Sequence, residues 1–254
     1  MKQVVSFSGG KDSTAMLLWL LEHKEPVDDV VFFDTGWEFP EMYDHLKKVE
    51  DYTGIKINII KPSESFTFML TQHRRVISRG KYKGKEMIGY GFPSFSTRWC
   101  TGRKQDAMNK YFMQYKQSGV TNCIGYAADE PKRFGNLHDT SWQKYRYPLV
   151  EAGMVEADAL KYCYERGFDW GGGYTRHKRL SCWCCPLQNK RSLRTLYRHY
   201  PKLWSQLKDW QKTLANNAHG QKGRHGYIDF QNNKSVFDLE ARFKAEDDQQ
   251  CLFD

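Results

Sequence analysis

Residues 8–13, SGGKDS, combine the residue types that a phosphate-binding loop requires. Gly9 and Gly10 can adopt backbone angles closed to other residues, so a ligand can approach the main chain closely. Ser13 and Thr14 stand where hydroxyl groups can cap a following helix. The first N–H groups of that helix would present a positive dipole end to an anion. The spacing therefore predicts a site for a phosphate group.

Two charged residues sharpen this prediction. Lys11 adds a positive charge for the phosphate, and Asp12 is a candidate ligand for a hard metal ion such as Mg²⁺. The loop is not a Walker A loop, because Asp12 follows Lys11 and Val5 stands where that pattern requires a glycine. The alternative is a simple Gly-Gly turn after a strand, which the flanking Ser, Lys, Asp and Ser residues disfavour.

The elements around the loop must place it at an edge of a sheet. Residues 4–21 contain a short apolar run, the loop and an apolar-rich helical pattern, which predicts a strand, a tight turn and a helix. Two further strands are predicted over residues 28–36 and 56–62, with a helix over 41–54 between them. This alternation indicates a parallel sheet covered on both faces. Ligands of such sheets bind beyond the carboxyl ends of the strands, where residues 34–36 would join the loop.

The later part of the chain is less regular. Residues 65–75 indicate a helix, and residues 78–98, rich in glycine and lysine, predict a mobile basic loop over the site. A functional lid and a tolerated insertion explain that loop equally well. Further helices are predicted up to about residue 115, over residues 156–170, and as a pair divided at Pro201.

Four motifs in order resemble one known family. SFSGGKDS at residues 6–13 is similar to the PP-loop of the N-type ATP pyrophosphatases, and FFDTGWEFPEMY at residues 32–43 is similar to their phosphoadenylylsulfate (PAPS) reductase branch. RWCTGRKQDAMNKYF at residues 98–112 and TNCIGYAADEPKRF at residues 121–134 resemble two later segments of the family. The resemblance covers roughly residues 1–190 and implies a doubly wound, mostly parallel α/β domain of the adenine nucleotide α-hydrolase type.

The resemblance also implies ligands and roles. It implies that the chain binds ATP or a related adenine nucleotide together with Mg²⁺. The residues implied to hold the nucleotide are Ser6, Ser8, Gly9, Gly10, Lys11, Asp12, Ser13, Asp34, Thr35, Gly36, Gly125, Asp129 and Glu130. The residues implied to act in catalysis are Lys11, Asp12, Arg103, Lys104 and Arg133, the last three by neutralising charge in the transition state. Taken without the other motifs, the acidic pair Asp129 and Glu130 would equally fit a surface turn.

The cysteines offer a second kind of chemistry. Cys182 and Cys185 have CxxC spacing, which is typical of metal or redox sites in intracellular proteins. A metal needs about four soft ligands, so a distant cysteine must contribute, and Cys100 is the candidate. Some sulfonucleotide reductases hold a [4Fe-4S] cluster with similarly placed cysteines, and this resemblance implies Cys100, Cys182, Cys184 and Cys185 as ligands. Structural zinc and unliganded or redox thiols are the alternatives.

The sequence departs from the reductase pattern in two places. Trp99 precedes Cys100 where the cluster-bearing relatives have a pair of cysteines, so Cys184 would replace the missing ligand. Reductases carry a catalytic cysteine in a C-terminal Glu-Cys-Gly motif, whereas here the cysteine near the C-terminus is Cys251, without a following glycine. This difference weakens the prediction of sulfite formation from PAPS. Cys123 and Cys163 lie in apolar patterns and are predicted to be ordinary buried residues.

The positive charge is concentrated in one segment. The chain has 39 basic and 30 acidic residues, a net charge of +9, and no acidic residue lies between Asp169 and Asp209. The basic residues of that segment are Arg176, Lys178, Arg179, Lys190, Arg191, Arg194, Arg198, Lys202 and Lys208. Interleaved aromatic residues could stack on bases: Tyr174, Trp183, Tyr197, Tyr200 and Trp204. The segment predicts a nucleic-acid partner, with a solvated helical face that compensates thiolate charge as the alternative.

The composition suits one substantial domain with an appendage. We expect a PP-loop α/β domain over residues 1–150, a smaller helical region with the cysteines and the basic face over 151–235, and a short helix with a flexible tail over 236–254. Since no apolar run approaches the roughly 20 residues of a membrane span, we expect a soluble, cytoplasmic protein without a membrane partner. Gln249 to Phe253 resembles the peptide by which bacterial DNA-processing proteins dock on the sliding clamp, and a tail folded on the core is the alternative.

These patterns favour one function over two others. The favoured function is an ATP pyrophosphatase-like enzyme that adenylates a target, releases pyrophosphate and supports sulfur transfer to nucleic acid, with a sulfur donor protein as a further partner. It resembles that of tRNA thiolation enzymes and of the ATP-hydrolysing component of DNA phosphorothioation systems. The alternatives are a PAPS or adenylylsulfate reductase, and a nucleotide-sensing, nucleic-acid-binding accessory protein docked on the sliding clamp.

Overall fold

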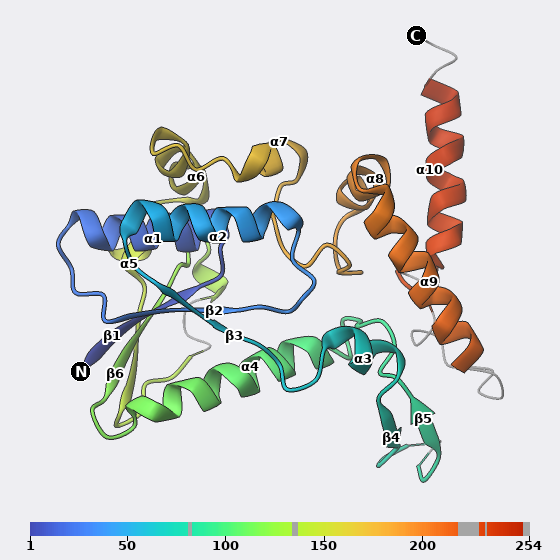
Figure 1. The fold of residues 1–254 in the computed structure, drawn as a ribbon, viewed down its shortest axis with the longest axis horizontal. Helices are drawn as coiled ribbons and strands as arrows, with labels where there is room; N and C mark the ends of the chain where they lie inside the picture. Colours follow the sequence, from blue (N-terminus) through green and yellow to red (C-terminus); the bar gives the residue numbers. More distant parts are fainter. Residues whose placement is uncertain (81–82, 134–136, 218–228, 232, 251–254) are drawn as a thin grey trace. The chain divides into compact units, whose positions relative to one another are not determined.

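The computed structural model describes all residues of the chain except 81–82, 134–136, 218–228, 232 and 251–254 (Figure 1). The chain divides into two compact units, and each unit is built from two stretches of sequence. The first unit comprises Met1–Lys61 and Lys104–Ser181, and the second comprises Pro62–Arg103 and Cys182–Asp254. Each unit is described by itself below.

A five-stranded sheet forms the centre of the first unit. Its strands are β1 (Lys2–Phe7), β2 (Asp29–Phe33), β3 (Ile57–Ile60), β6 (Val120–Ile124) and β7 (Gln143–Arg146). They lie in the order β3-β2-β1-β6-β7, and every neighbouring pair is parallel. Val5 of β1 stands opposite Val30 of β2 on one side and Cys123 of β6 on the other. The predicted parallel α/β sheet is confirmed.

Helices cover both faces of this sheet, as Figure 1 shows. The helices α1 (Lys11–Glu22) and α2 (Pro40–Thr53) lie on one face, with α6 (Glu156–Glu165) packed on α1. The helix α4 (Trp99–Phe112) covers the other face, where Phe112 packs against one valine from each of three strands, Val4, Val31 and Val120. Because both faces are buried, the central strands are continuous apolar runs and do not alternate apolar with polar residues.

Short helical turns complete the first unit. They are η1 (Met113–Tyr115), η2 (Pro131–Arg133), α5 (Pro148–Glu151), η3 (Trp170–Gly172) and α7 (Gly173–Arg176). Residues 151–181, which the sequence analysis assigned to the second region, cluster with the first unit. The cause is the contact of α6 with α1, which ties this stretch to the helix that follows the glycine loop.

The second unit is mainly helical. It contains α3 (Phe66–Thr71), α8 (Lys190–His199), α9 (Pro201–Asn217), α10 (Val236–Gln250) and an antiparallel pair of strands, β4 (Arg74–Val76) and β5 (Glu86–Ile88). Trp183 stacks on Trp210 of α9 with ring centroids 5.2 Å apart, and Phe243 of α10 is 1% exposed. The predicted helical, cysteine-bearing C-terminal region and the division of its helices at Pro201 are confirmed.

Four elements differ from the sequence-based predictions, and one of them is the helix predicted over residues 156–170, which ends at Glu165. The helix predicted over residues 65–75 ends at Thr71, because Arg74 to Val76 pair with Glu86 to Ile88 in the β4–β5 hairpin. Strand β5 of that hairpin lies within the stretch over residues 78–98 that was predicted to be a mobile loop. Strand β7 was not predicted, because it is a polar edge strand in which only Gln143 is buried.

Candidate functional site

The glycine loop lies where the order of the sheet reverses. Strands β2 and β3 lie on one side of β1, and β6 and β7 lie on the other. Ligands of open parallel sheets bind at such a reversal, beyond the carboxyl ends of the strands. The loop leaves β1 at this point, and Gly125 follows β6 beside it. A Cβ atom on Gly125 would lie 2.9 Å from the N and Cα atoms of Ser13, so only glycine allows the two segments to approach this closely.

The loop is held in shape by hydrogen bonds among its own residues. Gly9 has a φ of +73°, and a Cβ atom there would lie 2.3 Å from the Met42 sulfur. The Ser8 N–H donates to the Ser13 Oγ at 3.2 Å, and the Ser13 hydroxyl donates to the Gly10 carbonyl at 3.0 Å. The prediction that Ser13 or Thr14 caps the helix is wrong, because Gly10 is the N-cap residue and no side chain caps this helix.

The charged residues of the loop form a compact group. The Lys11 ammonium donates to Asp12 at 2.7 Å and lies 3.5 Å from Glu156. Lys11 is only 8% exposed. Burial is the largest cause that raises the pKa of Asp12, and the charges of Glu156 and Glu130 raise it further. The sequence analysis did not include Glu156, which comes from the first turn of α6. This group can neutralise phosphate oxygens through Lys11 and can offer carboxylate oxygens to a divalent cation.

The second motif follows β2 and is organised by its own side chains. The Asp34 carboxylate accepts from the Gly36 N–H and from the Tyr43 hydroxyl, both at 2.8 Å. The Thr35 hydroxyl donates to Glu38 at 2.7 Å. Burial raises the pKa of the Glu38 carboxyl above its usual range. The predicted residues 34–36 are therefore together in one turn, with Asp34 and Thr35 each only 7% exposed.

The basic residues predicted for catalysis have different environments. Lys104 lies 6.0 Å from the centre of the Phe33 ring, at the carboxyl end of β2, and its charge acts on Glu38. Arg133 lies 4.1 Å from the centre of the Tyr126 ring and donates twice to Glu130, at 2.7 and 2.9 Å. Arg133 is therefore already paired with a carboxylate.

Three other predicted residues have structural partners. Arg103 belongs to the second unit, where its guanidinium donates to the Tyr90 hydroxyl at 3.3 Å. Asp129 accepts from the N–H of Glu156 at 3.0 Å, at the start of α6. The Ser6 hydroxyl donates to Asn122 of the neighbouring strand at 2.7 Å.

A segment that the sequence analysis did not connect to the loop supports it from behind. We call residues 170–174 the WGGGY segment. The Trp170 indole donates to the Gly9 carbonyl at 2.7 Å, and the Lys11 N–H donates to the Tyr174 hydroxyl at 2.8 Å. Trp170 has a φ of +51°, which is unusual for a bulky residue and is often found at functional sites. The run of three glycines beside two aromatic residues was the signal for this role.

His45 joins the same support. Its Nε2 atom lies 2.9 Å from the Thr14 hydroxyl in a buried hydrogen bond, and its ring stacks on Trp170 with centroids 4.4 Å apart. Burial lowers the pKa of His45 to about 3. A neutral imidazole between α1, α2 and the WGGGY segment therefore fixes the first turn of α1.

The four cysteines predicted as metal ligands all lie in the second unit. Within the part of the chain that the structure describes, no three residues of the types Cys, His, Asp and Glu are grouped to hold a metal ion. Cys184 is buried, whereas Cys100, Cys182 and Cys185 are half-buried. The Cys182 and Trp183 carbonyls accept from the Gln188 side chain at 3.1 and 2.9 Å, so this turn is fixed by its main chain. These thiols, as placed, do not fit a [4Fe-4S] or zinc site.

The two other described cysteines are buried, as predicted. Cys123 and Cys163 are both 0% exposed. Burial raises the pKa of each thiol to about 12. The Cys163 thiol donates to the Lys11 carbonyl at 3.4 Å, so α6 contacts the main chain of the loop.

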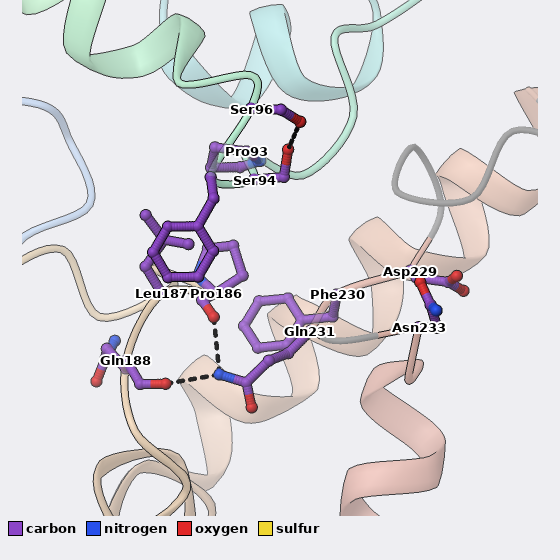
Figure 2. Close-up of a pocket in the computed structure, with 11 residues that line it drawn as sticks. Pro93, Ser94, Ser96, Pro186, Leu187, Gln188, Asp229, Phe230, Gln231 and Asn233 are labelled. Atoms are coloured by element: carbon purple, nitrogen blue, oxygen red, sulfur yellow. Dashed lines mark hydrogen bonds between the residues drawn. The ribbon is translucent and has the colours of Figure 1, made fainter.

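A pocket of about 420 Å³ lies beside the cysteine turn in the second unit, and Figure 2 shows its lining. Its walls come from the Pro93 to Ser96 loop, from Pro186 to Gln188, and from residues near Phe230. The Gln231 amide donates to the Pro186 and Gln188 carbonyls at 2.8 and 2.6 Å and so holds two of these walls together.

The basic segment is partly neutralised within each unit. Four of its nine basic residues contact carboxylates: Arg176 contacts Glu41, Arg194 contacts Glu246 and Asp247, Arg198 contacts Asp247, and Lys208 contacts Glu240. Trp183 and Trp204 are each 3% exposed and pack in the core, so they are not available to stack on bases. The clamp-like peptide from Gln249 to Phe253 lies outside the residues whose side chains are described.

Comparisons with known proteins relate the chain to one family, and the matched residues include the loop. A family model described as the phosphoadenosine phosphosulfate reductase domain matches residues 2–144. An uncharacterized protein of Methanocaldococcus jannaschii is 26% identical over 240 residues, which are 89% of this chain and 44% of that protein. An uncharacterized nin region protein of Escherichia phage lambda is 33% identical over 147 residues, which are 52% of this chain and 50% of that protein. The chain thus spans about half the length of these relatives.

Among solved structures, the phosphate complex of PAPS reductase from Candida auris is similar, with a TM-score of 0.43 and 18% identity. That likeness covers 66% of this chain and 74% of the other. Of the described residues, none forms a helix that is both long and apolar enough to cross a membrane. The family model covers more than half of the chain, including the loop, the second motif and β6. The chain belongs to the family of the phosphoadenosine phosphosulfate reductase domain.

Proposed function

We propose that the chain is an enzyme that binds ATP or a related adenine nucleotide at residues 8–13 and adenylates a target with release of pyrophosphate. The observation that carries this proposal is the fixed loop at the sheet reversal, in which Gly125 approaches the backbone of Ser13. Family membership supports the nucleotide, because the matching model describes a domain that acts on an adenine sulfonucleotide. The adenylation step itself is our proposal.

The reaction is a displacement at the α-phosphorus of the nucleotide. A nucleophilic oxygen of the target forms a bond to that phosphorus and loses its proton to solvent. The bond from the phosphorus to the oxygen that bridges to the β-phosphate breaks, and pyrophosphate leaves with the electron pair. Lys11 would neutralise charge that develops on the leaving group, since its ammonium is almost fully buried and lies against the loop.

The carboxylates near Lys11 suit a divalent cation that is shared with the nucleotide. Mg²⁺ in nucleotide sites is usually held by one or two carboxylates together with phosphate oxygens. Asp12 fits this description, because its carboxylate belongs to the loop and the Glu156 carboxylate lies near the same Lys11 ammonium. When bound, Mg²⁺ would withdraw charge from the phosphates.

The target and its later fate complete the proposal. We propose nucleic acid as the target and sulfur transfer, with sulfur from a separate donor protein, as the reaction that follows adenylation. The basic residues of α8 and α9 that contact no carboxylate in the described structure, including Lys190, Arg191 and Lys202, support a polyanionic target. No step is assigned to the cysteines, because no three candidate metal ligands are grouped in the part of the chain that the structure describes.

The alternative favoured by the family description is sulfonucleotide reduction. In that reaction two thiols supply two electrons, sulfite leaves the nucleotide, and a disulfide forms. The reaction needs an accessible thiolate, whereas burial raises the pKa of Cys123 and Cys163 to about 12. Cys251, the candidate for this role from the sequence, lies outside the described part of the chain. The half-buried cysteines are other candidate sources of a thiolate: Cys100, Cys182 and Cys185. A nucleotide sensor docked on the sliding clamp would bind ATP without releasing pyrophosphate.

The experiment is a product analysis with ATP labelled at the α-phosphate, in the presence of Mg²⁺ and mixed single-stranded oligonucleotides. We expect pyrophosphate together with a labelled target or AMP. The Asp12→Asn variant should lose this activity, whereas the matched control Asp51→Asn, an exposed residue of α2, should keep it. Release of phosphate in place of pyrophosphate would contradict the proposal.

A parallel assay separates the alternatives. Sulfite released from PAPS with a dithiol reductant, and lost in a Cys251→Ser variant, would establish the reductase. Binding of ATP without turnover would favour the sensor.

A further inference from the structure

Tyr174 places a hydroxyl group against the start of α1. Its oxygen accepts the N–H of Lys11 at 2.8 Å, which is the first residue of α1. That N–H is one of the donors that a helix start leaves unpaired and that anion sites use. The phenol proton donates to none of the described residues, so it can be given to a ligand.

Gly10 lets this hydroxyl lie close to the main chain of the loop. A Cβ atom on Gly10 would lie 3.3 Å from the Tyr174 oxygen and 3.7 Å from the Ser8 Oγ. The Ser8 hydroxyl is already bonded to the Ser13 Oγ at 3.0 Å, whereas the Tyr174 proton has no acceptor among the described residues. An oxygen atom of a phosphate group bound along the loop could therefore accept from Tyr174.

The Tyr174 side chain is fixed in this position. Its ring packs edge-to-face on Trp170 with centroids 4.8 Å apart, and Trp170 itself is bonded to the Gly9 carbonyl. Burial raises the pKa of the phenol above its usual range, and the charge of Asp12 adds to this effect. The group is thus a protonated donor at neutral pH, held by the WGGGY segment beyond the end of the family match at residue 144.

We propose that Tyr174 is a phosphate-binding residue of the loop, which accepts the Lys11 N–H and donates its own proton to a phosphate oxygen of the bound nucleotide. The proposal rests on the proposed nucleotide-binding function and extends the site to a residue outside the family model. It predicts a contact to phosphate and none to adenosine.

The test compares Tyr174→Phe with wild type in calorimetric titrations with ATP, inorganic pyrophosphate and adenosine. The variant keeps the ring and removes the hydroxyl, so we expect affinity for ATP and pyrophosphate to fall about tenfold, the usual size for a hydrogen bond to a charged group. Affinity for adenosine should not change. The matched control is Tyr162→Phe, because Tyr162 donates to Glu22 at the other end of α1.

The outcomes separate this inference from the function on which it rests. Wild type that binds neither ATP nor pyrophosphate would overturn the proposed function and the inference together. Wild type that binds both, with equal affinities in Tyr174→Phe, would overturn the inference alone. An equal loss for adenosine would show a purely structural role. If Tyr174→Phe does not fold, Gly10→Ala decides, because its methyl group would lie 3.3 Å from the Tyr174 oxygen and displace it. Unchanged pyrophosphate binding in Gly10→Ala would overturn the inference.

Discussion

The glycine loop and the cysteine turn both combine conspicuous residues with short spacing, yet different kinds of contact hold them in place. In the loop, distant segments contact the main chain: the Trp170 and Tyr174 side chains form hydrogen bonds with Gly9 and Lys11, and the backbone at Gly125 approaches Ser13. At the cysteine turn, Gln188 bonds the Cys182 and Trp183 carbonyls, Gln231 bonds the residues that follow, and Trp183 stacks on Trp210. The loop is thus held by separate parts of the sequence, whereas these contacts of the turn all come from the C-terminal stretch that contains it.

This difference shows where each prediction could succeed. A phosphate site needs mainly backbone donors in a fixed shape, which a short strand-loop-helix sequence specifies by itself. A metal site needs side chains to converge from separate segments, and spacing alone does not bring them together. The following predictions test how strongly each region depends on its contacts.

The largest effect is expected from Gly125→Ala. The added methyl group would lie 2.9 Å from the backbone of Ser13, so the loop or the end of β6 must move. We expect a loss of about 1–3 kcal/mol in the free energy of unfolding, as for other overpacked sites, and more than about tenfold weaker ATP binding. Calorimetry and denaturant unfolding measure both.

The control for this variant is Gly102→Ala in α4. A Cβ atom on Gly102 would meet no atom within 4 Å, so alanine should keep or raise the stability by about 0.5–1 kcal/mol. Equal free energies of unfolding and equal ATP affinities in the two variants would contradict a role of the close approach at Gly125 in stability and binding.

The second effect concerns the dependence of stability on pH. His45 is 3% exposed, and its pKa is lowered to about 3 from the ordinary value of 6.5. Below pH 6.5 His45 is protonated in the unfolded chain but stays neutral in the folded chain. The free energy of unfolding therefore falls as the pH falls. The contribution is about 2 kcal/mol between pH 6.5 and 5. Denaturant unfolding at both pH values should show this loss in wild type and a smaller loss in His45→Asn. The same loss in both proteins would contradict the role of His45.

The third effect concerns thiol reactivity. In a Cys251→Ser background we expect a thiol reagent to modify the half-buried Cys100, Cys182 and Cys185 in the native protein. Cys123 and Cys163 should react only after unfolding, because both residues are 0% exposed. Mass spectrometry after timed labelling identifies the modified residues.

The same experiment on protein purified without oxygen tests the sequence-based prediction of a [4Fe-4S] cluster. Bound iron that protects Cys100, Cys182, Cys184 and Cys185 would mean that these residues rearrange around a metal. Iron-free protein whose thiols react would agree with the positions of the four cysteines in this structure.

The smallest effect is expected from Asp247→Asn. Asp247 of α10 accepts from Arg194 and Arg198 of α8, and these guanidinium groups lower its pKa to about 2. The pairs are partly exposed, so the loss of stability should be below about 1 kcal/mol. If α8 binds a polyanion, removing one negative charge beside Arg194 and Arg198 should tighten the binding of single-stranded oligonucleotides and steepen its dependence on salt. Weaker binding would contradict a nucleic-acid role for this face.

The sequence predicts the parts of the site that are local. Strands β1 and β2, the turn at Asp34 and the glycine loop follow from short apolar runs that end in polar turns. The WGGGY segment could not be connected to the loop, because Trp170 and Tyr174 reach residues more than 160 positions earlier. The β4–β5 hairpin was missed for another reason, since its strands are three residues long and rich in charge. Long-range packing decides such elements, and local propensity does not.

The most direct test of the central claim is equilibrium binding of ATP, with Mg²⁺, to wild type and to Lys11→Ala. The loop predicts one nucleotide bound per chain in wild type. It also predicts at least about tenfold weaker binding in the variant, because the variant loses a buried cation of the loop that would pair with a phosphate. No binding to wild type, or equal binding to both proteins, would contradict the claim that residues 8–13 hold the phosphates of an adenine nucleotide.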